Sequence, residues 1–240
     1  MTDDPASAPH RPLPVQVPVR APPQEPLLQR LGRAPVTCAL ALTDFTMMLI
    51  AEHYGSTSET STLIRFGANE RSLVLAGEWW RLGTYMFLHG GWVHFILNTY
   101  VSWGWCSSVE RAMGRWRFLL TYLVAGVGGG CASALGHDVV SVGASGAIFG
   151  IIGARLVLER RAAPNWRAFS ASPLTRATLM GVAFWILLGV VVLPSIDNFA
   201  HGGGLAAGVA IAWMLTRCQI YGYAQSERMV RARGGSGAGN

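Results

Sequence analysis

The sequence predicts an all-α polytopic membrane protein, folded as a bundle of six transmembrane helices. Its 240 residues are 51% hydrophobic and only 13% charged, whereas soluble domains carry about 25% charged residues. The apolar residues form long runs, and the charged residues collect at the two ends of the chain and in short islands between the runs. The basic residues are divided unevenly between successive islands, which is the pattern that sets membrane orientation.

The two ends of the chain are expected to lie outside the membrane domain. Residues 1–34 form a proline-rich tail, since nine of the twelve prolines lie within 1–35, and such a segment buries too little apolar surface to order itself. The tail lacks an apolar core followed by a small-residue cleavage site, so it is not predicted to be a signal peptide. Residues 218–240 form an Arg/Gly-rich second tail, which is expected to be flexible from about Tyr221.

Six apolar runs lie between the tails, in one predicted membrane domain covering residues 35–217. A transmembrane helix needs about 20 mostly apolar residues. The fourth run is short, the first carries Asp44 at its centre without an evident function, and a tight link from Pro194 to Asn198 joins the last two. The predicted spans are 35–53, 92–109, 116–136, 143–159, 177–195 and 199–217.

Arginine placement predicts the orientation of this domain. All 19 basic residues are arginines. With the N-terminus inside, the inner segments hold sixteen of them and the outer segments hold only Arg65, Arg71 and Arg81. Both termini are therefore predicted to be cytoplasmic. Membrane topology also accounts for the net charge of +6 and the pI near 9.6, so the expected partner is the lipid bilayer and not a nucleic acid.

The longest outer connection, residues 54–91, contains Trp79-Trp80-Arg81. Amphipathic tryptophan rings favour the headgroup level of a bilayer. The pattern indicates a loop partly embedded in the membrane; an extended aqueous loop is the alternative.

A serine begins the fourth predicted span, within residues 142–150 (VGASGAIFG). The backbone N–H groups of a first helical turn have no partner in the helix and carry the positive end of its dipole. A nucleophile at Ser145 would have oxyanion donors beside it, its own N–H included. Gly143 and Gly146 would permit a sharp entry to the helix and close approach of a substrate backbone.

A histidine occupies a similar setting in the sixth predicted span, within residues 200–208 (AHGGGLAAG). Ser145 and His201 could serve as nucleophile and general base if their helices approach closely. The alternative is simple helix packing, because Gly146-xxx-Gly150 and Gly204-xxx-Gly208 are both small-xxx-small motifs. The two interpretations are compatible, since such packing would bring the two side chains together.

The second predicted span adds His94 and Asn98, which share one helix face because they are four residues apart. Both can donate hydrogen bonds to a negative charge that develops on a substrate oxygen. Hydrogen bonding between helices is the alternative role for this pair. A metal site built from His89, His94, His137 and His201 is a further alternative. No H-E-x-x-H pair or suitably spaced carboxylate supports it, so neither metal nor cofactor is expected.

Together these motifs resemble those of the rhomboid family of intramembrane serine proteases. The resemblance rests on G-x-S-G at residues 143–146, the histidine-glycine run at His201, and H-x-x-x-x-H-x-x-x-N at His89, His94 and Asn98. Trp80-Arg81 and Glu110-Arg111 with Gly114 also match, so the similarity extends from about residue 66 to 209 in the family's order and spacing.

The resemblance implies a function and a set of roles. Ser145 and His201 would form a catalytic dyad without a third acidic member, and the Ser145 backbone amide, His94 and Asn98 would stabilise the oxyanion. Family members often carry a tyrosine four residues after the serine, stacked on the histidine; Phe149 keeps the ring here but lacks the hydroxyl. Asp197, four residues before His201, is expected to start a helix and not to complete a triad.

The expected activity is cleavage of transmembrane protein substrates in a bacterial plasma membrane, with no prediction of oligomeric state. One rival is a rhomboid-like pseudoprotease that binds transmembrane clients without cutting them, although such relatives typically lack the serine or the histidine. A transporter is the other, and it would require internal inverted repeats, which the sequence does not show.

Overall fold

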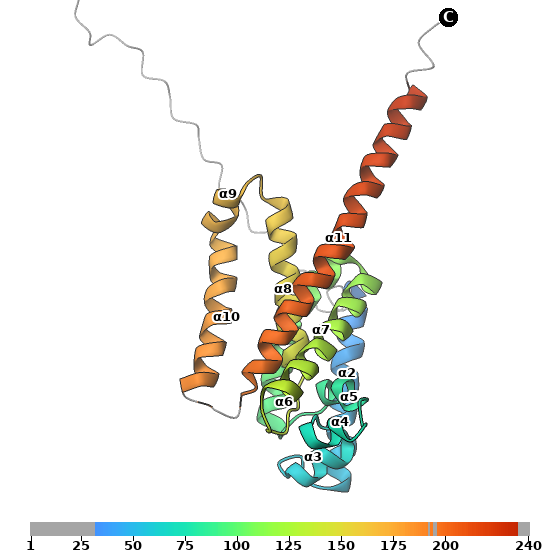
Figure 1. The fold of residues 1–240 in the computed structure, drawn as a ribbon. Coiled ribbons are helices and arrows are strands. Elements are labelled where there is room, and N and C mark those ends of the chain that lie inside the picture. The colour runs from blue at the N-terminus through green and yellow to red at the C-terminus, as the bar shows by residue number, and fades with distance from the viewer. Residues whose placement is uncertain (1–31, 192, 194–195, 235–240) are drawn as a thin grey trace, which may run out of the picture.

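The structure is a computed structural model that describes residues 32–191, 193 and 196–234, with side chains described as far as Thr216. The described chain is a bundle of helices (Figure 1). The only β-type pairing among these residues is an isolated antiparallel bridge between Asn69 and Ser141. The long helices are α2 (Pro35–Tyr54), α6 (Trp92–Met113), α7 (Arg115–Gly136), α8 (Ser145–Ala162), α10 (Pro173–Val191) and α11 (Asn198–Gly234).

A long helix lies at each of the six predicted spans, which confirms the helical-bundle fold class. Four of them are long and apolar enough to cross a membrane: α2, α7, α10 and residues Asn198–Thr216 of α11. The other two, α6 and α8, have 22 and 18 residues. That these two also cross the bilayer stays a prediction.

Each long helix differs from its predicted span at one end or both, and two of the differences have a local cause. Helix α10 begins at Pro173, four residues before the predicted start of its span, because proline is well tolerated in a first helical turn. The flexibility expected from about Tyr221 stays a prediction, but α11 continues to Gly234, beyond residue 217, where the sixth predicted span ends. The reason is local, since residues 224–233 are mostly Ala, Gln, Glu, Met and Arg, which are good helix formers. The proline-rich segment 1–31 lies outside the described residues.

Helices α7, α8 and α11 pack together at the centre of the bundle (Figure 1). Glycines make this possible, because Gly126, Gly129 and Gly130 of α7 lie where a Cβ would collide with Met86, Ala200 or Leu82. The main apolar core lies beside them and includes Phe118, Tyr122, Ile148, Ile151 and Ala154. The centre of the bundle is therefore a rigid frame for the N-terminal ends of α8 and α11.

A buried carboxylate attaches α2 to this frame. Glu110 of α6 is 1% exposed and accepts hydrogen bonds from the backbone N–H groups of Val36 and Thr37 at 2.9 and 2.8 Å. The Thr37 hydroxyl donates a third at 2.7 Å. Glu110 thus caps the start of α2, whose first N–H groups have no partner within the helix.

The connection between α2 and α6 contains short helices: α3 (Thr60–Phe66), α4 (Arg71–Leu75), α5 (Arg81–Thr84) and the 3-10 turn η1 (Tyr85–Phe87). It is held by the buried guanidinium of Arg81, which donates to the carbonyls of Ile64 and Ala68 at 2.7 and 3.0 Å. Arg81 also pairs with Glu78 at 2.7 Å. The alternative of an extended loop is therefore not found, and the predicted partial embedding of this connection in the membrane stays a prediction.

Candidate active site

Ser145 and His201 meet where α8 and α11 begin. The Ser145 Oγ lies 2.8 Å from His201 Nε2, which is within reach of a nucleophile–base hydrogen bond. Ser145, which was predicted to lie in the first turn of a span beginning at residue 143, is the first residue of α8, and His201 lies in the first turn of α11. His201 is 4% exposed and Ser145 is half-buried, so the imidazole is screened from bulk solvent more fully than the hydroxyl.

Glycines allow the two helices to come this close. A Cβ on Gly204 would collide with the Gly146 carbonyl oxygen, and one on Gly208 would collide with the Gly150 carbonyl oxygen. Both small-xxx-small motifs predicted from the sequence therefore lie on the α8–α11 contact. The packing interpretation is correct, and the same packing brings Ser145 to His201.

Phe149 sets the orientation of the histidine ring. Its ring lies parallel to that of His201, with centroids 4.1 Å apart and an interplanar angle of 5°. Phe149 stands one helical turn after Ser145, so a single face of α8 presents both the hydroxyl and the stacking surface. The stacking expected for this position is observed without a tyrosine hydroxyl.

His94 and Asn98 lie beside the backbone that enters α8. A Cβ on Gly143 would stand 2.8 Å from His94 Nε2 and 3.9 Å from Asn98 Nδ2. Gly143 has φ +119°, a conformation that side chains disfavour, so glycine is required here both for the turn and for the space. The sequence-predicted residues Gly143, His94 and Asn98 are thus brought together.

The hydrogen bonds made by His94 and Asn98 leave each side chain with an N–H that can donate to a further group. The Gly90 N–H donates to His94 Nδ1 at 3.3 Å, so in the neutral ring the proton is on Nε2, the nitrogen nearest Gly143. Asn98 Nδ2 donates one hydrogen to the His94 carbonyl at 3.1 Å and has a second hydrogen left. Two N–H donors therefore lie close to the residue two before Ser145.

Asp197 does not join His201 in a triad. Its Oδ1 accepts from the Ala200 N–H at 2.8 Å, which confirms the predicted helix-start role. The same atom lies 3.0 Å from Nε2 of His137. Burial acts to raise the pKa of Asp197, but the Ser133 and Ser141 hydroxyls, the Ala200 N–H and His137 together lower it.

Three residues near the site were not identified from the sequence as part of it. The buried Tyr85 accepts a hydrogen bond from the Gly143 N–H through its carbonyl at 3.0 Å, and its hydroxyl donates to the Gly126 carbonyl at 2.9 Å. His137 holds Asp197, and His89 packs edge-on against His94 at a centroid distance of 5.3 Å. Burial lowers the pKa of His89 to about 3, with a smaller contribution from His94.

Two other features of the sequence were Asp44 and the alternative of a metal site. Asp44 is buried within α2, and its Oδ1 has no hydrogen-bond partner. Among the described residues no three His, Cys, Asp or Glu side chains lie close enough together to hold a metal ion. The hydrogen-bonding groups at the start of α8 thus come from serine, histidine and asparagine.

Known proteins are similar to this chain in sequence. Residues 76–218 match the family model described as the rhomboid domain. The chain is 40% identical over 178 residues to the rhomboid protease GluP of Bacillus subtilis. It is 37% identical over 173 residues to RHOMBOID-like protein 4 of Arabidopsis thaliana, and 37% identical over 147 residues to the rhomboid-type serine protease 2 of Emericella nidulans.

These alignments cover more of this chain than of its relatives. They include 74%, 72% and 58% of the chain, but only 34%, 41% and 27% of the respective relatives. The chain therefore spans less than half the length of these three relatives. The match to the rhomboid domain, residues 76–218, contains the starts of α6, α8 and α11.

Proposed function

The chain belongs to the rhomboid family, and on that premise we propose that it is an intramembrane serine endopeptidase that cleaves transmembrane segments of other membrane proteins. The observation that carries the proposal is the 2.8 Å separation of Ser145 Oγ and His201 Nε2. Two of the relatives, those of Bacillus subtilis and Emericella nidulans, are named as proteases, which agrees with it. The apolar helices and the family make the chain an integral membrane protein.

In the proposed reaction His201 Nε2 takes the hydroxyl proton as Ser145 Oγ attacks the scissile carbonyl carbon. The tetrahedral intermediate collapses as His201 gives this proton to the amine nitrogen, and the C–N bond breaks. A water molecule then attacks the acyl-serine ester with His201 again as the base, which releases the acid and restores Ser145. Two groups suffice if the histidine ring is held in place, and stacking on Phe149 supports that condition.

The oxyanion is assigned to donors at the start of α8. The Ser145 N–H has no partner in its own helix, and His94 Nε2–H and Asn98 Nδ2–H lie beside Gly143. Preorganised donors of this kind are typically the largest single contribution to acyl-transfer catalysis. Gly143 leaves room beside them because any side chain there would occupy the position of the His94 ring.

The substrate class follows from where the dyad lies. Ser145 and His201 are at the ends of α8 and α11 opposite to the arginine-rich end of the bundle. We assign the site to the outer face of the membrane and both termini to the cytoplasm, in a bacterial plasma membrane. A substrate helix must then arrive from the lipid and unwind, because helical peptide bonds are shielded, and water must reach the acyl-enzyme from the outer side.

The test is labelling of the detergent-purified full chain with a fluorophosphonate probe, in parallel with cleavage of a transmembrane substrate in proteoliposomes. Ser145→Ala and His201→Ala should each abolish both signals and leave the thermal unfolding temperature close to that of the wild type. Ser170→Ala is the matched control, since Ser170 is exposed on the short helix α9 (Trp166–Ala171). Labelling or turnover in Ser145→Ala would identify another nucleophile and refute the assignment.

The rival is a rhomboid-like pseudoprotease that binds transmembrane clients without cleaving them. Absence of labelling in the folded wild-type chain, with an active rhomboid protease labelled alongside, would favour it. This chain has a 2.8 Å Ser–His contact, a histidine stacked on Phe149 and two nearby N–H donors. A pseudoprotease does not need these groups.

A further inference from the structure

A groove runs between α2 and α7 on the face of the bundle remote from the dyad. It has a volume of about 360 Å³, within the range of roughly 300–1,000 Å³ typical of small-molecule sites. One wall is a single face of α2 that includes Val36, Ala39, Leu40 and Thr43, and the other is the first turn of α7 and Leu119. Because the Thr43 hydroxyl donates to the Ala39 carbonyl of its own helix at 2.9 Å, this α2 wall offers mainly hydrocarbon to a ligand.

The mouth of the groove is cationic and aromatic. Arg115 and Trp116 line it, and the Trp116 side chain is 80% exposed. Arg111 and Arg117 flank them in sequence, and within the described part of the chain none of the three arginines forms an ion pair or a side-chain hydrogen bond. The nearby carboxylate in sequence, Glu110, is buried and already accepts three hydrogen bonds at the start of α2.

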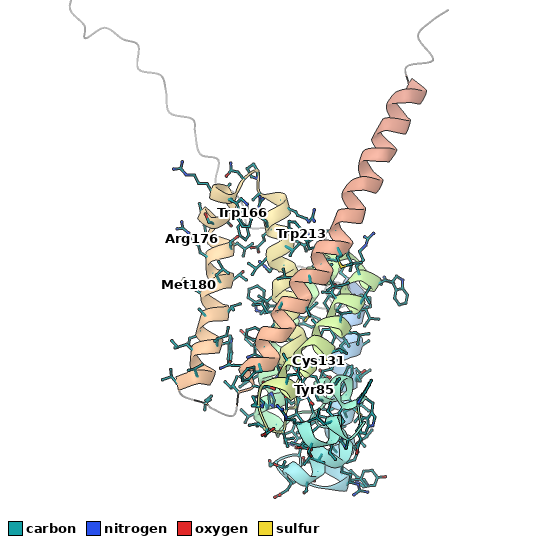
Figure 2. All side chains as sticks on the ribbon, viewed as in Figure 1. Tyr85, Cys131, Trp166, Arg176, Met180 and Trp213 are labelled. Atoms are coloured by element: carbon teal, nitrogen blue, oxygen red, sulfur yellow. The ribbon has the colours of Figure 1, made fainter. Side chains whose placement is uncertain are left out.

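Other arginines at the same end of the bundle are used within the protein. Arg155 pairs with Glu159 at 2.8 Å, and the guanidinium groups of Arg160 and Arg161 stack on the rings of Trp166 and Trp213 at 4.4 and 4.3 Å. Trp166 and Trp213 mark this end in Figure 2, far from Tyr85 beside the dyad. The α2–α7 region therefore differs from the rest of this end of the bundle: Arg111, Arg115 and Arg117 lie beside an apolar groove and pair with no carboxylate among the described residues.

We propose that the α2–α7 groove binds one anionic phospholipid, with an acyl chain between the two helices and the phosphate at Arg115. Basic pockets between transmembrane helices recognise anionic headgroups in this way, and an exposed tryptophan suits the headgroup level. The binding site does not depend on the proposed peptidase activity, because it shares no residue with the dyad.

The dimensions favour a lipid over a protein segment. The α2 wall from Val36 to Thr43 is roughly 12 Å long at 1.5 Å per residue. A helix is about 10 Å wide and would lie across the open mouth of a groove of about 360 Å³ instead of entering it. An acyl chain is narrow enough to enter it, and Arg115 then supplies the complementary charge for a phosphate.

The experiment counts lipids retained by the full, delipidated chain in native mass spectrometry, after addition of phosphatidylglycerol or of phosphatidylcholine with the same acyl chains. We expect one tightly held phosphatidylglycerol with a Kd at least fivefold below that of phosphatidylcholine. Arg115→Gln should weaken phosphatidylglycerol about fivefold, as expected for one basic residue near an anionic headgroup. Ala39→Trp, which fills the groove from an exposed position, should weaken both lipids.

The matched control is Arg167→Gln, an exposed arginine on α9 at the same end of the bundle. It should leave phosphatidylglycerol binding unchanged, and an equal loss in Arg115→Gln and Arg167→Gln would overturn the proposal by showing diffuse electrostatic attraction. Equal binding of the two lipids would also overturn it. So would dissociation of a dimer by Ala39→Trp, which indicates a second copy in the groove, or several-fold tighter lipid binding on deletion of residues 1–31, which indicates that this segment occupies it.

Discussion

His137 and Asp197, sixty positions apart in sequence, are joined by a 3.0 Å contact between the imidazole Nε2 and the carboxylate Oδ1. The Val139 N–H donates to the other ring nitrogen of His137 at 3.2 Å, so the neutral ring carries its proton on Nε2 and donates it to Asp197. Asp197 in turn receives the Ala200 N–H, one residue before His201. The end of α7 is thereby tied to the start of the helix that carries the dyad histidine.

The first prediction concerns this link. Asp197→Ala removes the helix cap and the partner of His137, and should lower the free energy of unfolding by about 1–2 kcal/mol. Asp197→Asn keeps a capping oxygen and should lose less. Thermal unfolding in detergent measures both, and equal losses in the two variants would mean that the cap contributes nothing. Fluorophosphonate labelling should still occur in both, since neither touches the serine; its complete loss in Asp197→Asn would instead place Asp197 in the catalytic machinery.

The second prediction concerns the ring that stacks on His201. Phe149→Leu removes an aromatic stack of about 0.5–1.5 kcal/mol, so kcat should fall by up to about tenfold as the histidine loses its orientation. Phe149→Tyr keeps the stack and should stay close to wild type. Rates of cleavage in proteoliposomes distinguish the two variants. A Phe149→Leu enzyme as fast as Phe149→Tyr would show that stacking does not hold the base.

The third prediction concerns the oxyanion donors. Asn98→Ala removes one N–H beside Gly143 and should reduce kcat about 10²–10³-fold, the loss typical of one such donor, while some turnover remains. Single-turnover cleavage measures the chemical step directly. Asn98→Asp, of similar size but unable to donate when ionised, should be at least as impaired. Wild-type turnover in Asn98→Ala would remove the residue from the site.

The fourth prediction concerns the α8–α11 contact. Gly204→Ala adds a methyl group that would collide with the Gly146 carbonyl oxygen, so the helices must separate. Both the unfolding temperature and the extent of probe labelling should fall. Gly202→Ala is the matched control two residues away, because a Cβ there meets nothing within 4 Å. It should match wild type in unfolding temperature. Equal behaviour of the two variants would contradict the observed helix spacing.

The fifth prediction concerns pH and His89. Burial lowers the pKa of this ring to about 3 in the folded chain, against about 6.5 when unfolded. Between these values the unfolded chain binds a proton that the folded chain does not, so the free energy of unfolding should decrease as pH falls from about 6.5 to about 3. His89→Gln should flatten this part of the unfolding-temperature profile. The exposed His53→Gln should leave the profile unchanged, and a profile unaltered by His89→Gln would contradict a buried neutral ring.

Local properties of the sequence determined much of this protein. The apolar runs predicted the six long helices and their order, because run length and composition set where a chain can be helical in a membrane. The motifs around Ser145, His201, His94 and Asn98 identified the residues that the fold brings to the starts of α8 and α11. Helix α11 runs past the end of its apolar stretch, because helix propensity and not hydropathy sets how far a helix continues outside the membrane domain.

Only the tertiary structure decided which of these residues meet. The sequence pattern does not predict that Asp197 contacts His137 and not His201. It also does not predict that Glu110 binds the start of α2. Such contacts depend on which faces of distant helices pack together. The role of Tyr85 between Gly143 and Gly126 has the same origin, and so does the α2–α7 groove. The sequence determined which helices and reactive side chains are present. The distance between Ser145 and His201 was decided by the packing of α8 against α11, because close contact between their backbones sets that distance. The glycines that allow this contact are Gly146, Gly150, Gly204 and Gly208.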